Sequence, residues 1–289
     1  MLPEKFLDRM CKMLGEEEYQ QFLKSYTQEE YHALRVNTLK VEGTWIEQHL
    51  DFVQEPVAWN RDGFYYRQDD RPGCHPFHDA GVYYIQEASA QAPVVYLDPK
   101  PGERILDLCA APGGKSTQIA AAMKGEGILV SNEIHPARAK ILSENVERMG
   151  IRNALVTNEA PQKLERLFEE YFDRVLVDAP CSGEGMFRKN EEACGQWSTE
   201  NVELCARRQD EILSCAAHML RPGGRLVYST CTFAPAENEG TILRFLQNHP
   251  EFTIEQVERF PGMEPGNPRW AVEYGSEEQL SDLGLEHTV

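Results

Sequence analysis

Two cysteines occur in short segments that follow predicted strands. Cys181 lies in the sequence Asp-Ala-Pro-Cys-Ser-Gly that begins at Asp178, and Cys231 lies in Ser-Thr-Cys-Thr-Phe, residues 229–233. Irregular segments of this kind give solvent access to a thiol, whose thiolate form is a nucleophile. Free cysteines elsewhere behave as small hydrophobes, and we interpret four of them in this way: Cys11, Cys194, Cys205 and Cys215.

A glycine-rich turn earlier in the chain is a candidate binding site for a second molecule. Residues Asp107–Ser116, Asp-Leu-Cys-Ala-Ala-Pro-Gly-Gly-Lys-Ser, separate a predicted strand at 105–108 from a predicted helix at 115–123. Backbone can approach a ligand closely at such a turn, and the helix N-terminus presents free N–H groups to it. The identity of the ligand depends on the residues around the turn.

Two nucleotide-binding interpretations of this turn are weak. The pattern G-x-x-x-x-G-K-[ST] of P-loop NTPases is met at Gly114, Lys115 and Ser116, and Val175–Asp178 could form the accompanying acidic strand. Its first glycine is replaced by Cys109, which removes the backbone freedom needed to wrap a triphosphate. The G-x-G-x-x-G spacing of dinucleotide-binding domains is absent, so that alternative is weaker still.

S-adenosylmethionine (SAM) fits the surrounding residues better. It carries an adenosine but no pyrophosphate, so it needs a close-approach turn and an acid for the ribose diol rather than a phosphate cradle. Glu133 ends the second predicted strand, where its carboxylate would accept both ribose hydroxyls, and Asn158 and Glu159 follow the third strand, near the expected adenine edge. The sequence therefore predicts a SAM site at this edge.

A thiol beside a methyl donor indicates chemistry on carbon 5 of cytosine. Attack of a thiolate on carbon 6 converts carbon 5 into an enamine-like nucleophile, and elimination later releases the enzyme. Asp178 is suited to protonate or hydrogen-bond N3 during the attack. Methylation of an exocyclic amine needs no thiol, so the cysteine pair discriminates between the two reactions. These residues alone do not decide whether Cys181 or Cys231 attacks.

The elements that position these residues alternate between strand and helix. A parallel sheet with right-handed crossovers is expected, an α/β fold in which ligands bind beyond the carboxyl ends of the strands. The expected strands are 105–108, 128–132, 154–157, 174–178 and 225–230, and the expected helices are 84–97, 136–149, 161–171 and 199–219.

The residues before this sheet predict a smaller α+β unit. Two helices are expected within residues 2–26, followed by a strand at 33–39, a helix at 44–51 and a strand at 63–67. We place the domain boundary where the pattern changes, giving an N-terminal domain of residues 1–82 and a catalytic domain of residues 83–289.

Composition narrows the class of protein. The 289 residues carry a net charge of −18, which argues against a protein that coats polyanions but does not exclude a local basic groove. Among the eight cysteines there is no C-x-x-C pair, so zinc-ribbon and thioredoxin-like proteins are excluded. Cys74, His75 and His78 are interpreted as a loop, and no metal site is expected. Without a signal peptide or a long apolar run, we expect free thiols, a cytoplasmic location and no membrane partner.

The motifs together resemble the Nop/Sun family of RNA cytosine-C5 methyltransferases, and within it the bacterial enzymes of small-subunit ribosomal RNA. The resemblance rests on these segments: Leu34–Lys40, Tyr84–Ser89, Asp107–Ser116, Glu133 with Arg138, Asp178–Lys189, and Tyr228–Phe233 with Glu237 and Asn238. It implies a SAM-dependent methyltransferase, with a Rossmann-like sheet and a small N-terminal RNA-contacting domain.

The resemblance also implies residue roles. It implies that Cys231 is the nucleophile and that Cys181 assists release of the methylated RNA. The implied SAM contacts are Cys109, Ala110, Ala111, Pro112, Gly113, Gly114, Lys115, Glu133, Arg138, Asp178 and Glu159. The acid after the third strand is commonly Asp in relatives, so Asn158-Glu159 departs from the family pattern.

The expected partner is ribosomal RNA, within a ribosomal subunit or its precursor, bound by a monomer through an unstacked target cytosine. Candidate phosphate and stacking residues are Arg35, Lys40, Arg61, Arg67, Arg71, Tyr65, Tyr66, Arg188 and Lys189. The alternative function from another class is a non-catalytic SAM-binding factor of ribosome assembly.

Relatives continue beyond the point that corresponds to the end of this chain. We therefore expect a C-terminally truncated record that lacks the last strand of the sheet. Phe252–Gln256 would then form the penultimate strand, without its usual neighbour.

Overall fold

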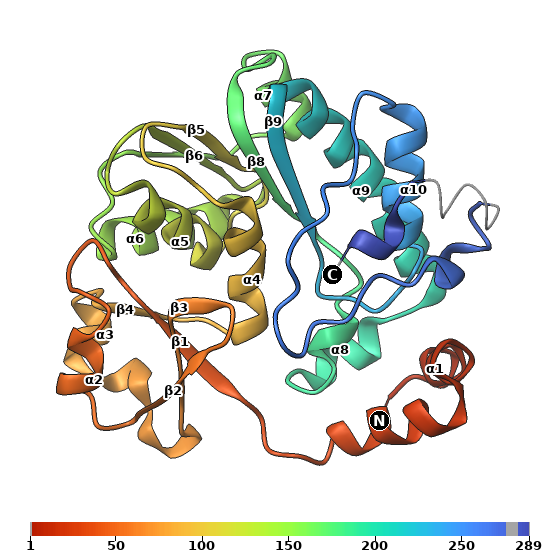
Figure 1. Ribbon diagram of the computed structural model, residues 1–289, viewed down its shortest axis with the longest axis horizontal. Helices are drawn as coiled ribbons and strands as arrows, with labels where there is room; N and C mark the ends of the chain where they lie inside the picture. Colours follow the sequence, from red (N-terminus) through yellow and green to blue (C-terminus); the bar gives the residue numbers. More distant parts are fainter. Residues whose placement is uncertain (1, 276–282, 289) are drawn as a thin grey trace. The chain divides into compact units, whose positions relative to one another are not determined.

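The computed structural model describes residues 2–275 and 283–288, and the chain divides into two units (Figure 1). The sheet unit comprises Tyr31–Asp178 and Cys215–Ser229, and the cysteine unit comprises Met1–Glu30, Ala179–Ser214 and Thr230–Val289. None of the helices in the described ranges combines the length and hydrophobicity required to cross a bilayer.

A five-stranded parallel sheet organises the sheet unit, which confirms the expected α/β fold. Its strand order is β7-β6-β5-β8-β9. Because all of these strands are parallel, the carboxyl ends of β5, β6 and β8 lie at the same edge of the sheet. The strand order reverses at the central strand β5, and ligands bind at such a position. The strands are β5 (Arg104–Asp107), β6 (Ile128–Asn132), β7 (Ala154–Thr157), β8 (Phe172–Asp178) and β9 (Leu220–Ser229).

Helices α4 (Ala88–Leu97), α5 (Gly114–Met123) and α6 (Pro136–Arg148) lie side by side along this sheet (Figure 1). The apolar faces of α4 and α5 bury a core against β5, β6 and β8 whose members have no or almost no exposed surface: Val94, Leu97, Ile105, Ile119, Met123, Leu129 and Leu176. The helix expected at 161–171 is shorter, because α7 (Pro161–Glu165) ends before a turn in which Glu170 adopts a left-handed conformation.

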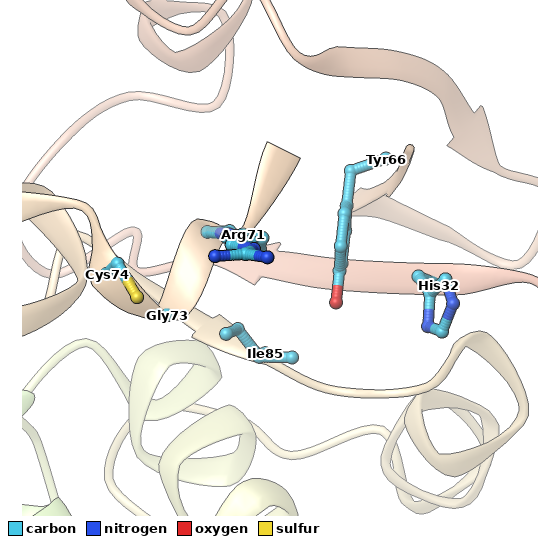
Figure 2. Close-up of a pocket in the computed structure, with 7 residues that line it drawn as sticks. His32, Tyr66, Arg71, Gly73, Cys74 and Ile85 are labelled. Carbon is cyan, nitrogen blue, oxygen red and sulfur yellow. The ribbon is translucent and has the colours of Figure 1, made fainter. Parts of the chain in front are cut away.

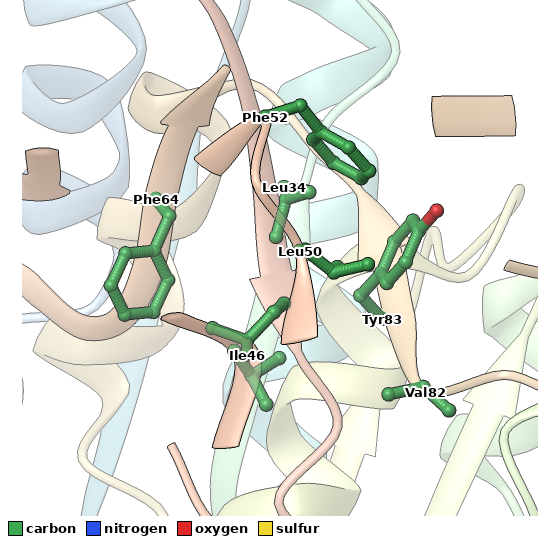
Figure 3. Close-up of a cluster of buried hydrophobic side chains, with 8 residues drawn as sticks. Leu34, Ile46, Leu50, Phe52, Phe64, Val82 and Tyr83 are labelled. Carbon is green, nitrogen blue, oxygen red and sulfur yellow. The ribbon is translucent and has the colours of Figure 1, made fainter. Parts of the chain in front are cut away.

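A second, antiparallel sheet precedes the parallel one and has the strand order β2-β3-β1-β4. With α2 (Trp45–His49) and α3 (Pro76–Asp79) it forms the β-α-β-β-α-β arrangement of ferredoxin-like folds. Leu34, Ile46, Phe64 and Tyr83 are among the buried side chains between this sheet and its helices (Figure 3). The strands are β1 (His32–Val36), β2 (Val53–Val57), β3 (Asn60–Tyr66) and β4 (Tyr83–Ile85).

Two strands of this sheet differ from expectation. Strand β2 was not predicted, and the helix predicted to begin at Tyr84 begins at Ala88. Tyr83–Ile85 instead pairs with β1, a partner far away in sequence, and that pairing overrides the local helical pattern.

The cysteine unit is built from helices and loops. The two helices predicted in residues 2–26 are confirmed, because α1 (Glu4–Ser25) is interrupted at Gly15, whose φ is 73°. Phe6 packs edge-on against Phe187 with ring centroids 5.0 Å apart. The other elements are α8 (Glu191–Gln196), α10 (Glu239–Asn248), the first part of α9 (Thr199–Met219) and the 3-10 turns η3 (Glu184–Met186), η4 (Pro268–Ala271) and η5 (Leu285–His287).

The strand expected at Phe252–Gln256 is wrong, since this segment has no regular secondary structure. Its apolar side chains pack on α10 and its neighbours instead of joining a sheet. The Phe252 ring lies 5.0 Å from that of Phe245, and Ile254 packs against the cluster of Leu243, Ala271 and Leu285. Alternating apolar residues produce a strand only where a partner strand supplies the hydrogen bonds.

Candidate active site

The glycine-rich turn joins β5 to α5 at the carboxyl edge of the parallel sheet. Gly113 caps α5 with a φ of 114°, a conformation that other residues rarely adopt. A Cβ at Gly113 would lie 3.1 Å from Leu142 Cδ1, and one at Gly114 would lie 3.3 Å from Tyr84 Cε1. Gly113 is therefore required by its backbone conformation, and Gly114 by close packing against Tyr84.

Neighbouring elements hold the backbone of this turn. The Ala110 N–H donates to the Asn132 carbonyl at 2.8 Å, and the Ala111 carbonyl accepts from Arg138 at 2.8 Å. Asn145 donates to the Pro112 carbonyl, also at 2.8 Å. Strand β6 and helix α6 thus set the shape of the turn before any ligand binds.

Three carboxylates stand at the ends of β5, β6 and β8. Asp107 is fully buried, and one of its oxygens accepts a hydrogen bond of 2.6 Å from Ser116 Oγ. Its other oxygen, Oδ1, is buried without a hydrogen-bond partner among the described residues. Burial, with Asp178 and Glu133 nearby, raises the pKa of Asp107 to about 7.

Glu133 is the second of these acids and is 3% exposed. Its Oε1 accepts from the His135 N–H at 2.9 Å, and its Oε2 lies 3.2 Å from Arg138 NH1. The structure thus brings together Glu133 and Arg138, which were predicted as a pair.

Asp178, the third acid, links two further predicted residues. Its Oδ2 lies 2.7 Å from Lys115 Nζ, and its Oδ1 accepts from Ser229 Oγ at 2.8 Å. The Asp178 side chain keeps 35% of its surface exposed, so it remains accessible to a ligand.

The residues after β7 have partners within the protein. Asn158 donates from its side chain to the Glu133 carbonyl at 2.6 Å and therefore supports the backbone of that acid. Glu159 pairs with Lys163 at 2.6 Å, and its N–H donates to Asn132 Oδ1 at 3.1 Å.

Cys109 lies in the turn itself and differs from the two cysteines at 181 and 231. Burial raises its pKa well above the ordinary thiol range, and the nearby Asp107 carboxylate adds to this effect. Cys109 therefore stays a neutral thiol that lines the turn.

In the cysteine unit, the two predicted reactive cysteines are in contact. Cys181 Sγ and Cys231 Sγ lie 3.2 Å apart, and the Cys231 N–H points to Cys181 Sγ at 3.4 Å. Cys231 is exposed, whereas Cys181 is partly buried. The hydrogen bond to Cys231 and burial raise the pKa of Cys181.

Buried Glu237 holds the loop of Cys181. Its Oε2 accepts from the Ser182 N–H and from Gln209 Nε2, both at 2.9 Å, and its Oε1 accepts from Ser182 Oγ. Ser182 Oγ also lies 2.9 Å from Thr232 Oγ1, directly after Cys231. This carboxylate therefore fixes the residues that follow both cysteines.

A second buried acid, Glu184, was not predicted to have a role. Its carboxylate accepts from Trp197 Nε1 at 2.9 Å and from the Phe233 N–H at 3.1 Å, and it pairs with Arg9 of α1 at 2.5 Å. It therefore joins the Cys181 loop to the Cys231 segment. Its position within the segment 178–189 was the only available sequence signal.

The predicted RNA-contacting residues Arg35 and Lys40 have other roles. Arg35 is 1% exposed and donates to Gln86 Oε1 at 2.9 Å and to Thr117 Oγ1 at 2.7 Å. Lys40 Nζ donates to the carbonyls of Ala80 and Arg148 at 2.6 and 2.7 Å. A phosphate cannot reach buried Arg35, so that expectation is wrong, and the residue instead supports the first turn of α5.

The remaining candidates for RNA contact differ in availability. Arg61 is 92% exposed, whereas Arg67 pairs with Asp70 at 3.1 Å and Arg188 donates to the Gln28 carbonyl.

In the described part of the chain, no group of three or more His, Cys, Asp or Glu side chains is arranged to hold a metal ion.

Comparisons with known proteins agree with this geometry. A family model described as 16S rRNA methyltransferase RsmB/F matches residues 94–272, and one for the N-terminal domain of 16S rRNA methyltransferase RsmF matches residues 2–88. Ribosomal RNA small subunit methyltransferase F of Escherichia fergusonii is 37% identical over 278 residues, covering 90% of this chain. The chain spans 57% of the length of that relative.

Solved structures support the same assignment. The crystal structure of PH0851 has 33% identity and a TM-score of 0.83, covering 92% of this chain and 60% of its own. A methyltransferase homologue from Pyrococcus horikoshii has 29% identity and a TM-score of 0.78, covering 96% of this chain and 93% of its own. The family resemblance drawn from the motifs is confirmed: the chain belongs to the 16S rRNA methyltransferase RsmB/F family.

Proposed function

We propose that this protein transfers a methyl group from SAM to carbon 5 of a cytosine in small-subunit ribosomal RNA. The contact of 3.2 Å between Cys181 and Cys231 carries the proposal, because cytosine-C5 chemistry is the methyl transfer that needs a thiol. The relative from Escherichia fergusonii is a ribosomal RNA small subunit methyltransferase, which supports the same substrate.

The carboxyl edge of the parallel sheet fits SAM. Gly113 and Gly114 leave a surface that a Cβ would fill, and buried Asp107 Oδ1 offers an acceptor without a partner among the described residues. SAM, when bound here, supplies the methyl group. The residues proposed to hold it are Cys109, Ala110, Ala111, Pro112, Gly113, Gly114, Lys115, Glu133, Arg138, Glu159 and Asp178.

The P-loop alternative fits the turn poorly. The hydroxyl of a P-loop serine must be free to bind Mg²⁺, but Ser116 is fully buried and its Oγ donates to Asp107 at 2.6 Å.

The cysteines divide the covalent chemistry between them. Cys231, the exposed thiol, attacks carbon 6 of cytosine as a thiolate and forms the C–S bond. After carbon 5 has been methylated and has lost its proton to a base, the C–S bond breaks and Cys231 leaves as a thiolate. Cys181, whose sulfur lies 3.2 Å from that of Cys231, donates a hydrogen bond to that thiolate and so assists release.

Both cysteines follow residues of the sheet edge closely in the sequence. Asp178 precedes Cys181 by three positions, and Ser229, which donates to Asp178 at 2.8 Å, precedes Cys231 by two. Asp178 is therefore proposed to act on N3 of the cytosine.

We further propose a division into an RNA-contacting domain of residues 1–82 and a catalytic domain of residues 83–289. The division follows the change of pattern in the sequence and lies close to the boundary between the two matched family models. The protein is proposed to act as a monomer on ribosomal RNA in a ribosomal subunit or its precursor.

Two cysteine variants test the function. Cys231→Ala should abolish methyl transfer from radiolabelled SAM to 16S ribosomal RNA and leave SAM affinity in calorimetry near normal. Cys181→Ala should trap a covalent RNA–protein complex, visible as a slow band in a denaturing gel. Cys11→Ala, outside both loops, is the control. Retained turnover in Cys231→Ala would reject the proposal, and SAM binding without turnover in the unmodified chain would favour the non-catalytic alternative.

A further inference from the structure

A pocket of about 310 Å³ lies beside the antiparallel sheet of the sheet unit (Figure 2). Its lining comes from the first residue of β1, the last residues of β3 and β4, and the residues that follow η1 (Gln68–Asp70), namely Arg71 and η2 (Pro72–Cys74). These residues are His32, Tyr66, Arg71, Pro72, Gly73, Cys74 and Ile85. None of them belongs to the SAM site proposed above.

Two stacked aromatic rings form one wall of this pocket. His32 and Tyr66 are directly paired across β1 and β3, and their rings are stacked with centroids 5.6 Å apart and planes 30° from parallel. Pro72 and Ile85 add apolar surface. Such a wall suits a planar aromatic ligand, since every nucleobase has a face that stacks on aromatic side chains.

A positive charge accompanies the aromatic wall. Arg71 is exposed, and Figure 2 shows its side chain between Cys74 and Tyr66 in that view. In the described residues no carboxylate pairs with its guanidinium, because the neighbouring Asp70 binds Arg67 at 3.1 Å. A free guanidinium beside a stacking surface is suited to a phosphate.

The backbone at Arg71 is held in an unusual conformation. Its φ of 45° and ψ of 55° are left-handed, which costs energy for a residue with a Cβ and persists only where neighbours enforce it. The enforcing contacts are the hydrogen bond of 2.9 Å from the Cys74 N–H to the Arg71 carbonyl, and that of 2.7 Å from the Tyr83 hydroxyl to the Pro72 carbonyl. The backbone from which the Arg71 side chain extends is therefore fixed.

One polar atom in the wall lacks a partner. His32 Nε2 is buried and makes no hydrogen bond to any described residue. Buried ring nitrogens are normally satisfied, so this atom is available to a polar ligand.

We propose that this pocket binds one unstacked nucleotide of single-stranded RNA, at a position other than the target cytosine. The base stacks against the His32–Tyr66 wall and its phosphate pairs with Arg71. The volume lies at the lower end of the range for ligand sites, which suits one nucleotide and excludes a duplex. The inference rests on the proposed function only in taking RNA as the substrate.

Binding of a fluorescent single-stranded RNA to the full chain tests the pocket. Arg71→Gln should weaken binding by about tenfold, and Arg152→Gln, which removes an exposed arginine outside the pocket, by less than about twofold. Tyr66→Leu should also weaken binding, whereas Tyr66→Phe keeps the ring and should bind normally. Circular dichroism verifies that each variant is folded.

The exposed thiol of Cys74 provides an independent readout that needs no substitution. Its labelling by a maleimide should be slowed by the RNA, with Cys11 as the internal reference. Equal protection by inorganic phosphate alone would overturn the nucleotide assignment. Equal binding by Arg71→Gln and Arg152→Gln, with no protection of Cys74, would overturn the site.

Methylation separates this inference from the proposed function. Arg71→Gln should raise KM for 16S ribosomal RNA and leave kcat unchanged, because the residue acts on binding away from the chemistry. Pocket-dependent RNA binding without methylation by the unmodified chain would reject the proposed function and support the pocket. If the unmodified chain methylates the RNA and Arg71→Gln leaves KM unchanged, the proposed function is supported and the pocket is rejected.

Discussion

Asp107 in the sheet unit and Glu237 in the cysteine unit are both fully buried carboxylates, but their surroundings differ. Asp107 accepts one hydrogen bond, from Ser116, and its second oxygen has no partner among the described residues. Glu237 accepts hydrogen bonds from Gln209 and from both the N–H and the hydroxyl of Ser182. Asp107 therefore has one carboxylate oxygen without a hydrogen bond among the described residues, whereas both oxygens of Glu237 accept hydrogen bonds.

This difference separates two kinds of buried acid. A buried oxygen without a hydrogen-bond partner costs free energy. Such an oxygen is therefore expected at a site where a bound ligand supplies the missing hydrogen bond. A saturated acid instead holds loops in place, because each of its bonds would be lost if the loops moved. Strand ends position the carboxylates of the sheet unit, whereas buried glutamates position the thiols of the cysteine unit.

The largest expected effect is the pH dependence of Asp107. Its pKa is raised from 3.8 to about 7 in the folded state, so folding favours the protonated form. The stability contributed by that form is complete below the unfolded pKa and is lost as the pH rises towards 7. Between pH 4 and 7 the free energy of unfolding should fall by up to about 4 kcal/mol more than in Asp107→Asn. Urea titrations of both proteins measure this difference, and parallel pH profiles would contradict it.

Glu237→Ala should destabilise the protein by about 3 kcal/mol, because it leaves buried donors of Ser182 and Gln209 without an acceptor. It should also change the rate at which Cys231 reacts with a thiol reagent, since Ser182 and Thr232 lose their anchor. Glu203→Ala, an exposed acid on α9, is the control and should cost less than about 0.5 kcal/mol. Equal unfolding free energies of the two variants would show that Glu237 does not hold the loop of Cys181 in place.

Substitution of two left-handed glycines tests the glycine-rich turn. Gly113→Ala should cost about 2 kcal/mol, because the new Cβ is strained and lies 3.1 Å from Leu142 Cδ1. Gly125→Ala shares the positive φ, 79°, but has open space around it and should cost about 1 kcal/mol. Thermal unfolding compares the two. SAM affinity should fall only in Gly113→Ala, and its loss in both variants would mean that strain alone is responsible.

The smallest effect is expected at the exposed acid after β7. Lys163→Ala removes the partner of Glu159, an ion pair exposed on both sides, and should change stability by less than about 0.5 kcal/mol. Calorimetry should show SAM affinity altered by less than about twofold. A tenfold change would show that this pair positions Glu159 for the ligand and is comparable in importance to the buried acids.

The core of the parallel sheet could be predicted because its strands are continuous apolar runs, such as Ile128–Asn132 and Ala154–Thr157, whose bounds agree with the structure. Strand β4 could not, because it is short and its partner β1 is remote in sequence. Strand β2 pairs with the adjacent β3, but three of its five residues, Gln54–Pro56, are exposed, so it lacks an apolar pattern. Arg35 was interpreted as an exposed cation, since nothing local indicates that α5 will cover it.

Residue types and spacing alone indicated the glycine turn, the strand-end acids and the two cysteine segments, because each depends on a run of adjacent residues. Tertiary packing decided which polar groups those segments meet. The Glu184 carboxylate pairs with an arginine 175 positions away, and the two thiols come within 3.2 Å across 50 positions. Contacts at such separations arise from how elements pack, and no local pattern encodes them.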